Sequence, residues 1–360
     1  MKGVYLAKKN LFPMPLFIRR NLYILLAITF FHFSLSSCSE VSNAKEAVVA
    51  DTTLPEKKPE VWVAPSITDT ASYKAILAHI TNGDKTGKWP VKDSLPRQGA
   101  ILPFQRIIAY YGNLYSKNMG ILGELPKDSM FKKLKTEVEK WQKADTMLHI
   151  VPALHYIAVT AQGSPGAGNT YRLRMPFNQI DKIISLASEI NALVFLDVQV
   201  GRSTLEKEIP ELEKYLSLAN VHLGIDPEFS MKTGKRPGSV IGSFDAADIN
   251  YAVNYLDNIV KKNNLPPKIL VVHRFTNPMV TNYKQIKPKP SVQIVMNMDG
   301  WGSAAKKIST YTSFISPQPV EFTGFKIFYK NDTKKIGQLK EMQPEQVLKL
   351  KPQPVYIQYQ

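Results

Sequence analysis

A regular alternation of short apolar segments with amphipathic segments constrains the fold of this 360-residue chain most strongly. Strands that alternate with helices favour a parallel sheet with the helices outside it. Helical patterns lie at about 129–144, 176–190, 203–219, 244–263 and 301–315, with weaker ones near 278–287 and 333–348. The segments predicted as strands are 104–112, 150–160, 192–200, 221–229, 269–275, 292–300, 322–330 and 355–359. Eight strand–helix units predict an α/β fold, the (β/α)8 or TIM barrel.

The alternation leaves no helix after the last predicted strand. We expect the segment 69–82, which contains Ile76, Leu77 and Ile80, to cover that position from the N-terminal side. No Gly-x-Gly-x-x-Gly motif follows the first strand, which disfavours an open dinucleotide-binding sheet. The segment 68–360 is therefore predicted to form a single barrel domain.

The N-terminal segment has the pattern of an export signal. Five basic residues and no acidic residue precede an apolar run at 22–35, which is followed by Ser36-Ser37-Cys38 after Leu35. The run is shorter than the roughly 20 apolar residues that span a bilayer. Leu-Ser-Ser-Cys resembles the lipobox of bacterial lipoproteins, which implies that residues 1–37 are removed and that Cys38 is acylated. Cys38 is the only cysteine, so internal disulfides are excluded.

The composition after the signal predicts a tether and a basic protein. Residues 38–67 are rich in Ala, Val, Pro, Glu, Lys and Thr without periodicity, which is typical of a disordered linker. Removal of residues 1–37 takes five of the 46 basic residues and none of the 30 acidic ones, which leaves a net charge of +11. We expect an exported protein anchored to a bacterial membrane, at the outer membrane or the cell surface. Anionic surfaces or glycans fit this charge, whereas nucleic acid is not an expected partner.

Carboxyl groups recur where the predicted strands end, which is the catalytic end of a TIM barrel. Alternate residues of a strand share a face. On 221–229 this places Asp226 and Glu228 opposite the apolar residues, together with His222. The same alternation places Asp197 beside Gln199, and Asp299 beside Gln293 and Asn297. Three strands are therefore predicted to direct carboxyl groups into the barrel mouth.

Carboxyl groups that are close together raise one another's pKa, which can leave a protonated acid beside an ionised base. Cleavage of a glycosidic bond needs this combination. We therefore predict Glu228 as the acid and Asp226 as its modulator or as the stabilising carboxylate, with Asp197 and Asp299 as further candidates. Asp-Pro-Glu is also compatible with a simple turn.

Other polar and aromatic residues near the strand ends are predicted to bind substrate. Arg202 follows Asp197 and could pair with a carboxylate or with an anionic substrate group. His273 and His155 lie on the fifth and second strands, but no His-x-His or His-Glu-x-x-His spacing is present, so no metal or other cofactor is expected. The predicted substrate-binding residues are Gln199, Arg202, His273, Trp301 and Tyr356.

Several motifs resemble known proteins. Leu196-Asp197-Val198-Gln199-Val200-Gly201-Arg202-Ser203, Gly224-Ile225-Asp226-Pro227-Glu228 and Met298-Asp299-Gly300 resemble an uncharacterised group of bacterial secreted proteins and lipoproteins with a TIM barrel. Asp226-Pro227-Glu228 and Met296-Asn297-Met298-Asp299 are also similar to motifs of chitinase-like family 18 glycosidases. The second resemblance implies that Glu228 is the acid, that Asp226 assists an acetamido group and that Asp299 helps to hold it. Val221, Gly224 and Met298 depart from that pattern.

The sequence thus predicts a membrane-anchored lipoprotein with a glycoside-hydrolase-like barrel that acts on a cell-envelope or environmental polysaccharide. Two alternatives remain open: a non-catalytic barrel that binds glycan or an envelope partner, and a metal-dependent hydrolase.

The lipobox generates the first testable prediction. Replacing Cys38 by Ser removes the only thiol that lipid can modify. We expect the wild-type protein to incorporate labelled palmitate and to sediment with membranes, and the Cys38→Ser variant to do neither. Ser37→Ala, which keeps a small residue before the cysteine, is the control. Palmitate incorporation into Cys38→Ser would contradict the prediction.

Overall fold

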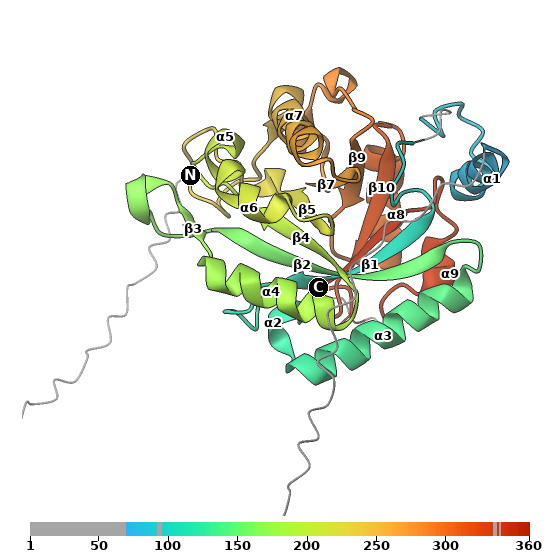
Figure 1. Ribbon diagram of the computed structural model, residues 1–360, viewed down its shortest axis with the longest axis horizontal. Coiled ribbons are helices and arrows are strands. Elements are labelled where there is room, and N and C mark those ends of the chain that lie inside the picture. The colour runs from blue at the N-terminus through green and yellow to red at the C-terminus, as the bar shows by residue number, and fades with distance from the viewer. Residues whose placement is uncertain (1–69, 92–95, 334–336, 338–339) are drawn as a thin grey trace, which may run out of the picture. The chain divides into compact units, whose positions relative to one another are not determined.

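The computed structural model describes residues 70–91, 96–333, 337 and 340–360. These residues form a closed barrel of eight parallel strands with helices around it (Figure 1). Strand β1 (Gln105–Gly112) pairs with both β2 (His149–Ala161) and β11 (Tyr356–Tyr359), and this double pairing closes the barrel. Between β2 and β11 stand, in barrel order, β4 (Leu193–Val198), β5 (Val221–Ile225), β7 (Lys268–Arg274), β9 (Val292–Met298) and β10 (Phe322–Ile327). The predicted (β/α)8 fold is confirmed, whereas Cys38 and the predicted signal and linker lie outside the described residues.

Four of the predicted helices are confirmed, with small shifts of their ends. They are α3 (Lys127–Ala144), α4 (Phe177–Glu189), α7 (Ala246–Asn263) and α8 (Ala304–Thr310), the last of which continues as a π-helix over Tyr311–Ile315. In Figure 1, α3 and α4 lie along the outside of the strands near β1 and β2. Their apolar faces join the outer hydrophobic layer of the barrel.

The helix predicted at 203–219 is broken into three short pieces. They are α5 (Leu205–Glu208), a 3₁₀ turn (Pro210–Leu212) and α6 (Glu213–Leu216). Pro210 has no N–H to donate, so one continuous helix cannot pass through this position unperturbed.

The helices predicted from the two weaker patterns, at 278–287 and 333–348, were largely wrong. Residues 278–287 contain 3₁₀ turns (Asn277–Met279 and Tyr283–Gln285) around β8 (Val280–Thr281), which pairs with β6 (Phe244–Asp245). In the described part of 333–348 the helix is the single turn α9 (Pro344–Val347). The remaining short elements are α2 (Ile121–Glu124), β3 (Arg172–Arg174) and 3₁₀ turns at Ala167–Asn169 and Pro227–Phe229.

The alternation along each strand separates two hydrophobic layers, as predicted. Val221, Leu223 and Ile225 of β5 belong to the layer between strands and helices. Phe195 and Val271 belong to a second cluster inside the barrel. Polar residues that alternate in step with these inner apolar residues along the same strands therefore point into the barrel.

Helix α1 (Thr70–Thr81) covers the amino-terminal end of the barrel. Its Leu77 and Ile80 pack with Ile101 and Val355, which belong to the cluster inside the barrel. The backbone oxygen of Ile80 accepts a hydrogen bond from the N–H of Gln353. The prediction that this segment takes the place of an eighth outer helix was therefore wrong, because its apolar residues close the barrel floor instead.

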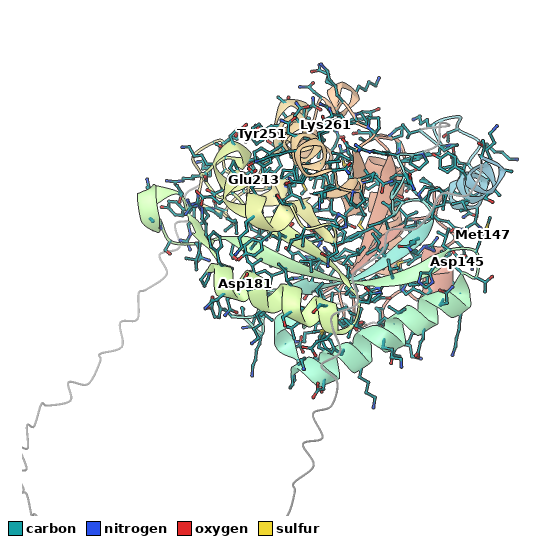
Figure 2. All side chains as sticks on the ribbon, in the orientation of Figure 1. Asp145, Met147, Asp181, Glu213, Tyr251 and Lys261 are labelled. Carbon is teal, nitrogen blue, oxygen red and sulfur yellow. The ribbon has the colours of Figure 1, made fainter. Side chains whose placement is uncertain are left out.

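The turn between α3 and β2 ties this floor together. Asp145 accepts a hydrogen bond from the backbone N–H of Met147 at 2.9 Å (Figure 2). The same carboxylate forms ion pairs with the buried Arg106 at 3.0 Å and with His79 of α1 at 3.1 Å. None of the helices in the described part of the chain is both long enough and apolar enough to cross a membrane.

Gly224 on β5 generates a stability prediction. A Cβ at this position would lie 2.3 Å from Asp197 Oδ1 and 2.4 Å from His155 Nε2, both inside the barrel. We expect Gly224→Ala to lower the free energy of unfolding by about 2 kcal/mol, as overpacked cores do, and urea unfolding measures this change. Gly163→Ala is the control, because there the added Cβ meets only the flexible end of Arg236. Equal stability of the two variants would contradict the prediction.

Candidate active site

A cavity of about 690 Å³ opens at the carboxyl ends of the barrel strands. Its polar lining includes the acidic residues Asp226, Glu228 and Asp299, together with Lys326. Its walls are strongly aromatic, with Tyr111, Phe229, Phe275, Trp301, Phe314 and Phe328. The cavity therefore combines ionisable groups with flat apolar surfaces.

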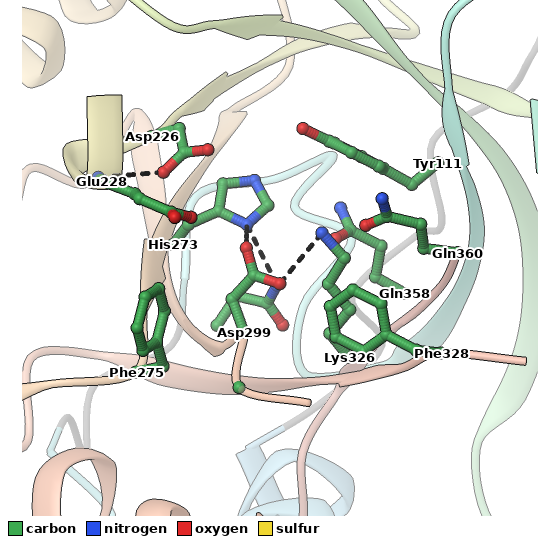
Figure 3. A network of polar contacts seen from close by, with 12 residues as sticks. Tyr111, Asp226, Glu228, His273, Phe275, Asp299, Lys326, Phe328, Gln358 and Gln360 are labelled. Carbon is green, nitrogen blue, oxygen red and sulfur yellow. Dashed lines mark hydrogen bonds and ion pairs between the residues drawn. The ribbon is translucent and has the colours of Figure 1, made fainter. Parts of the chain in front are cut away.

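A chain of alternating charges lies at the base of this cavity, and Figure 3 shows its members His273, Asp299 and Lys326. His273 on β7 forms an ion pair with Asp197 of β4 at 3.3 Å and another with Asp299 at 2.8 Å. Asp299, directly after β9, is also 2.9 Å from Nζ of Lys326 on β10. The charges of the four groups sum to zero when both carboxyls are ionised and both bases are protonated. Because all four side chains are buried, each depends on its neighbours for stabilisation.

The pKa values of the chain follow from this pairing. Burial lowers the pKa of His273, but Asp197 and Asp299 outweigh it and raise that pKa to about 10. Burial raises the pKa of Asp299, but Lys326 and His273 hold it below its usual value. Burial also raises the pKa of Asp197, but His273 and His155 hold it below its usual value. His273 is therefore an imidazolium at neutral pH, held between two carboxylates.

Asp197 is enclosed by hydrogen bonds below the cavity. The Tyr111 hydroxyl donates to its Oδ2 at 2.9 Å, and Nε2 of His155 lies 3.2 Å from its Oδ1. Burial lowers the pKa of His155 to about 4, so this imidazole is neutral. With Nε2 donating to Asp197, Nδ1 of His155 accepts from the Tyr356 hydroxyl at 2.5 Å.

The group His155, Asp197 and His273 is the one set of candidate metal ligands found among the described residues. One ligand atom of each lies within 4.8 Å of the others. Neutral His155 can donate to Asp197, and protonated His273 balances its charge, so the three groups satisfy one another electrostatically. None of the three lines the cavity, and the ring of Tyr111 lies 5.3 Å from that of His155 and 5.8 Å from that of His273. We therefore assign these residues a structural role.

Asp226 and Glu228 lie on the 3₁₀ turn that follows β5. Asp226 caps this turn, because its Oδ1 accepts the backbone N–H of Glu228 at 3.0 Å (Figure 3). Gln199 donates to the other oxygen at 3.4 Å. Burial and the neighbouring carboxylates, first Glu228, raise the pKa of Asp226 well above its usual value, although His273 opposes them. Burial and then Asp299 raise the pKa of Glu228 to about 7 against the opposing effects of Lys326 and His273.

The predicted site residues fall into two levels. Asp226, Glu228, Asp299, Gln199 and Trp301 line the cavity together. The other predicted residues do not line it: Asp197, His273 and Tyr356 are buried beneath, and Arg202 stands outside and stacks on Tyr171 at 4.0 Å.

Sequence reasoning missed Lys326, the cation that pairs with Asp299. Its signal was present, because Lys326 has the same parity on its strand as Phe322 and Gly324, and Phe322 packs inside the barrel. A lysine with inward parity in an apolar strand requires a buried partner. Its Nζ also lies 3.9 Å from the centre of the Tyr111 ring.

Comparison with known proteins gives no match to this chain, either among protein-family models or among curated proteins.

The raised pKa of Glu228 generates a prediction about stability and pH. In the folded protein Glu228 keeps its proton up to a pKa of about 7, whereas an unperturbed Glu loses it at 4.5. Its contribution to the free energy of unfolding therefore falls as pH rises from 4.5 to 7 and stays low above that range. Between pH 4.5 and pH 8, we expect Glu228→Gln to gain about 2 kcal/mol relative to the wild type, measured by urea unfolding. The exposed Glu206→Gln should show no such trend, and a pH-independent difference for Glu228→Gln would contradict the prediction.

Proposed function

We propose that this protein is a glycoside hydrolase, in which Glu228 is the general acid and Asp299 is the ionised carboxylate. The observation that carries the proposal is that the two groups line one aromatic cavity while their pKa values are shifted in opposite directions, so that Glu228 keeps a proton to far higher pH than Asp299 does. The pKa of Glu228 is raised to about 7, while that of Asp299 is lowered by Lys326 and His273. Acid and carboxylate in separate protonation states are what glycosidic cleavage needs.

In the proposed reaction, Glu228 donates its proton to the glycosidic oxygen as the bond from that oxygen to the sugar carbon breaks. Positive charge develops on the sugar carbon, and the carboxylate of Asp299 stabilises it. Water then adds its hydroxyl to that carbon and releases its other proton, and Glu228 is reprotonated. Atoms and charge balance without a cofactor.

Asp226 has a supporting part in the proposal. Because its pKa is raised well above the usual value, its carboxyl group is protonated and can donate a hydrogen bond to a substrate oxygen. Its hydrogen bond from the N–H of Glu228 also fixes the start of the turn that presents the acid. Asp226 is thus a binding and positioning group rather than the stabilising carboxylate.

The aromatic walls favour a carbohydrate over other hydrolysable substrates. Phe275 and Phe328 lie on either side of Asp299 in Figure 3, and Trp301 at the rim is 43% exposed. Sugar rings have apolar faces that stack on such side chains while their hydroxyls bond to polar groups at the edges. The lipobox at Cys38 supports action outside the cytoplasm, with the barrel anchored to a bacterial membrane by acylation and the substrate in the cell envelope or the surroundings.

Activity of the Glu228→Gln variant tests the proposal. Glutamine keeps the size of the side chain but cannot donate the proton, so we expect hydrolysis of a cleaved polysaccharide to fall by about 10²- to 10⁴-fold, as for other general acids. Release of reducing ends across a polysaccharide panel measures it, with Glu206→Gln as the matched control.

Hydrolysis by Glu228→Gln at the wild-type rate would overturn the role of Glu228. Binding of a glycan without cleavage by the wild type would instead identify a non-catalytic binding protein. Loss of hydrolysis on treatment with a chelator, restored by added metal, would identify a metal-dependent hydrolase.

A further inference from the structure

One cation at the rim of the cavity has no acidic partner in the described part of the chain. Lys306, in the first turn of α8, lines the cavity and is exposed. Its Nζ lies 5.2 Å from the centre of the Trp301 ring. By contrast, Lys326 deeper in the cavity is neutralised by Asp299.

The position of Lys306 is defined by local packing. A Cβ on Gly302 would lie 2.8 Å from Cδ of Lys306, so the aliphatic stem lies against the bare backbone of Gly302. Gly302 has a φ of +143°, a conformation that other residues rarely adopt. The stem is therefore held close to the backbone, and the ammonium group is presented beside an exposed indole.

A second group of unneutralised cations lies at the same end of the barrel. Arg202 lies three residues after Gln199, which lines the cavity. Nε of Arg202 donates a hydrogen bond to the backbone oxygen of Lys235 at 3.4 Å. Lys235 and Arg236 are exposed in the loop that continues from the lining residue Phe229. No carboxylate pairs with these three cations among the residues that the structure describes.

Other basic residues nearby do have acidic partners. Arg172 and Arg174 share the carboxylate of Glu208, at 2.8 and 2.7 Å. Lys232, in the same loop as Lys235, pairs with Asp248. Acidic partners thus neutralise the cations farther along these segments and leave Arg202, Lys235 and Arg236 available.

The two groups belong to segments that follow different strands of the barrel. Arg202 follows β4 and Lys306 follows β9, and these strands stand three positions apart in the barrel order. A polymer with repeated anionic substituents that is laid across the mouth can contact both groups at once. The carboxyl groups between them would repel such a polymer less than their number suggests, because Asp226 keeps its proton and Asp299 is paired with Lys326.

We propose that the mouth binds an acidic polysaccharide, whose anionic substituents contact Lys306 on one side and the group Arg202, Lys235 and Arg236 on the other. This proposal rests on the proposed glycoside hydrolase function and names its substrate class. Carboxylate and sulfate substituents share the required chemistry. The net charge of +11 after removal of residues 1–37 adds a general attraction for such polymers.

Calorimetric titration of Glu228→Gln, which suppresses turnover, tests the proposal with defined oligosaccharides. The ligands are an oligogalacturonate for carboxylate, a chondroitin sulfate oligomer for sulfate, a neutral xylo-oligosaccharide, and a DNA duplex as a charged polymer without the sugar chemistry of a polysaccharide. Lys306→Gln and the double change Arg202→Gln with Arg236→Gln are added to this background. The control pair Lys284→Gln and Lys287→Gln removes two exposed charges beside α7.

We expect at least one acidic oligosaccharide to bind more tightly than the neutral one. Each lost rim charge should weaken that binding about two- to fivefold, the range for exposed ion pairs, and the control pair should change it little. Equal affinity for the neutral oligosaccharide would overturn the proposal. An equal loss in the control pair, or DNA binding as tight as that of the acidic oligosaccharides, would also overturn it, since both indicate attraction by net charge alone.

The outcomes separate this inference from the proposed function. Binding of acidic oligosaccharides through the rim, with no cleavage by the wild type, would remove the hydrolase and keep the acidic ligand. Cleavage of a neutral glycan that depends on Glu228, without binding of acidic ones, would keep the hydrolase and overturn the inference.

Discussion

The charge chain Asp197–His273–Asp299–Lys326 is the interaction on which the upper half of the barrel depends. Each group is buried among aromatic and apolar side chains, where an isolated charge costs several kcal/mol even after relaxation. The alternation of sign removes most of this cost, because every charge has an opposite neighbour at 2.8 to 3.3 Å. Loss of Asp299 would leave Lys326 without an ionic partner, and loss of His273 would leave Asp197 without its cation, so the inner members couple the strands that supply the chain.

This chain also explains why the other two carboxyl groups behave differently. The two cations form ion pairs with Asp197 and Asp299. His273 also lowers the pKa of Asp226, and both cations lower that of Glu228, but for these two groups burial is the largest effect. Burial then dominates, and it favours the protonated form of both. The distinction between an ionised carboxylate and a protonated acid in one cavity thus arises from which groups touch the cations. The chemistry proposed for the site depends on this unequal distribution of partners.

The sequence was sufficient to predict the barrel, because strand periodicity is local and repeats eight times. It also placed Asp226, Glu228 and Asp299 at the carboxyl ends of strands, although all three lie just beyond β5 or β9 and not within a strand as predicted. It was not sufficient to predict which inward groups meet. His273 contacts Asp299 because β7 and β9 pair with His273 beside Asn297, a register that no local pattern encodes. Lys326 was not predicted as a site residue, and its partner Asp299 comes from the neighbouring strand β9, a contact that no local pattern encodes. The break at Pro210 within the predicted helix 203–219 was visible in the sequence but was outweighed there by the surrounding periodicity.

The inward-facing positions of the strands form an apolar core near the barrel floor and a polar site near the carboxyl ends. Near the barrel floor, inward positions hold Phe195, Val271 and Val295, which pack without polar cost. Towards the carboxyl ends the inward positions hold charged and polar groups, and apolar packing gives way to ion pairs and hydrogen bonds. Gly224 lies at this transition, where the absence of a side chain leaves the space occupied by Asp197 Oδ1 and His155 Nε2. Near the carboxyl ends of the strands, inward charged groups replace apolar packing and surround a cavity. Such a loss of apolar packing is expected at a functional site, where residues are not selected for stability alone.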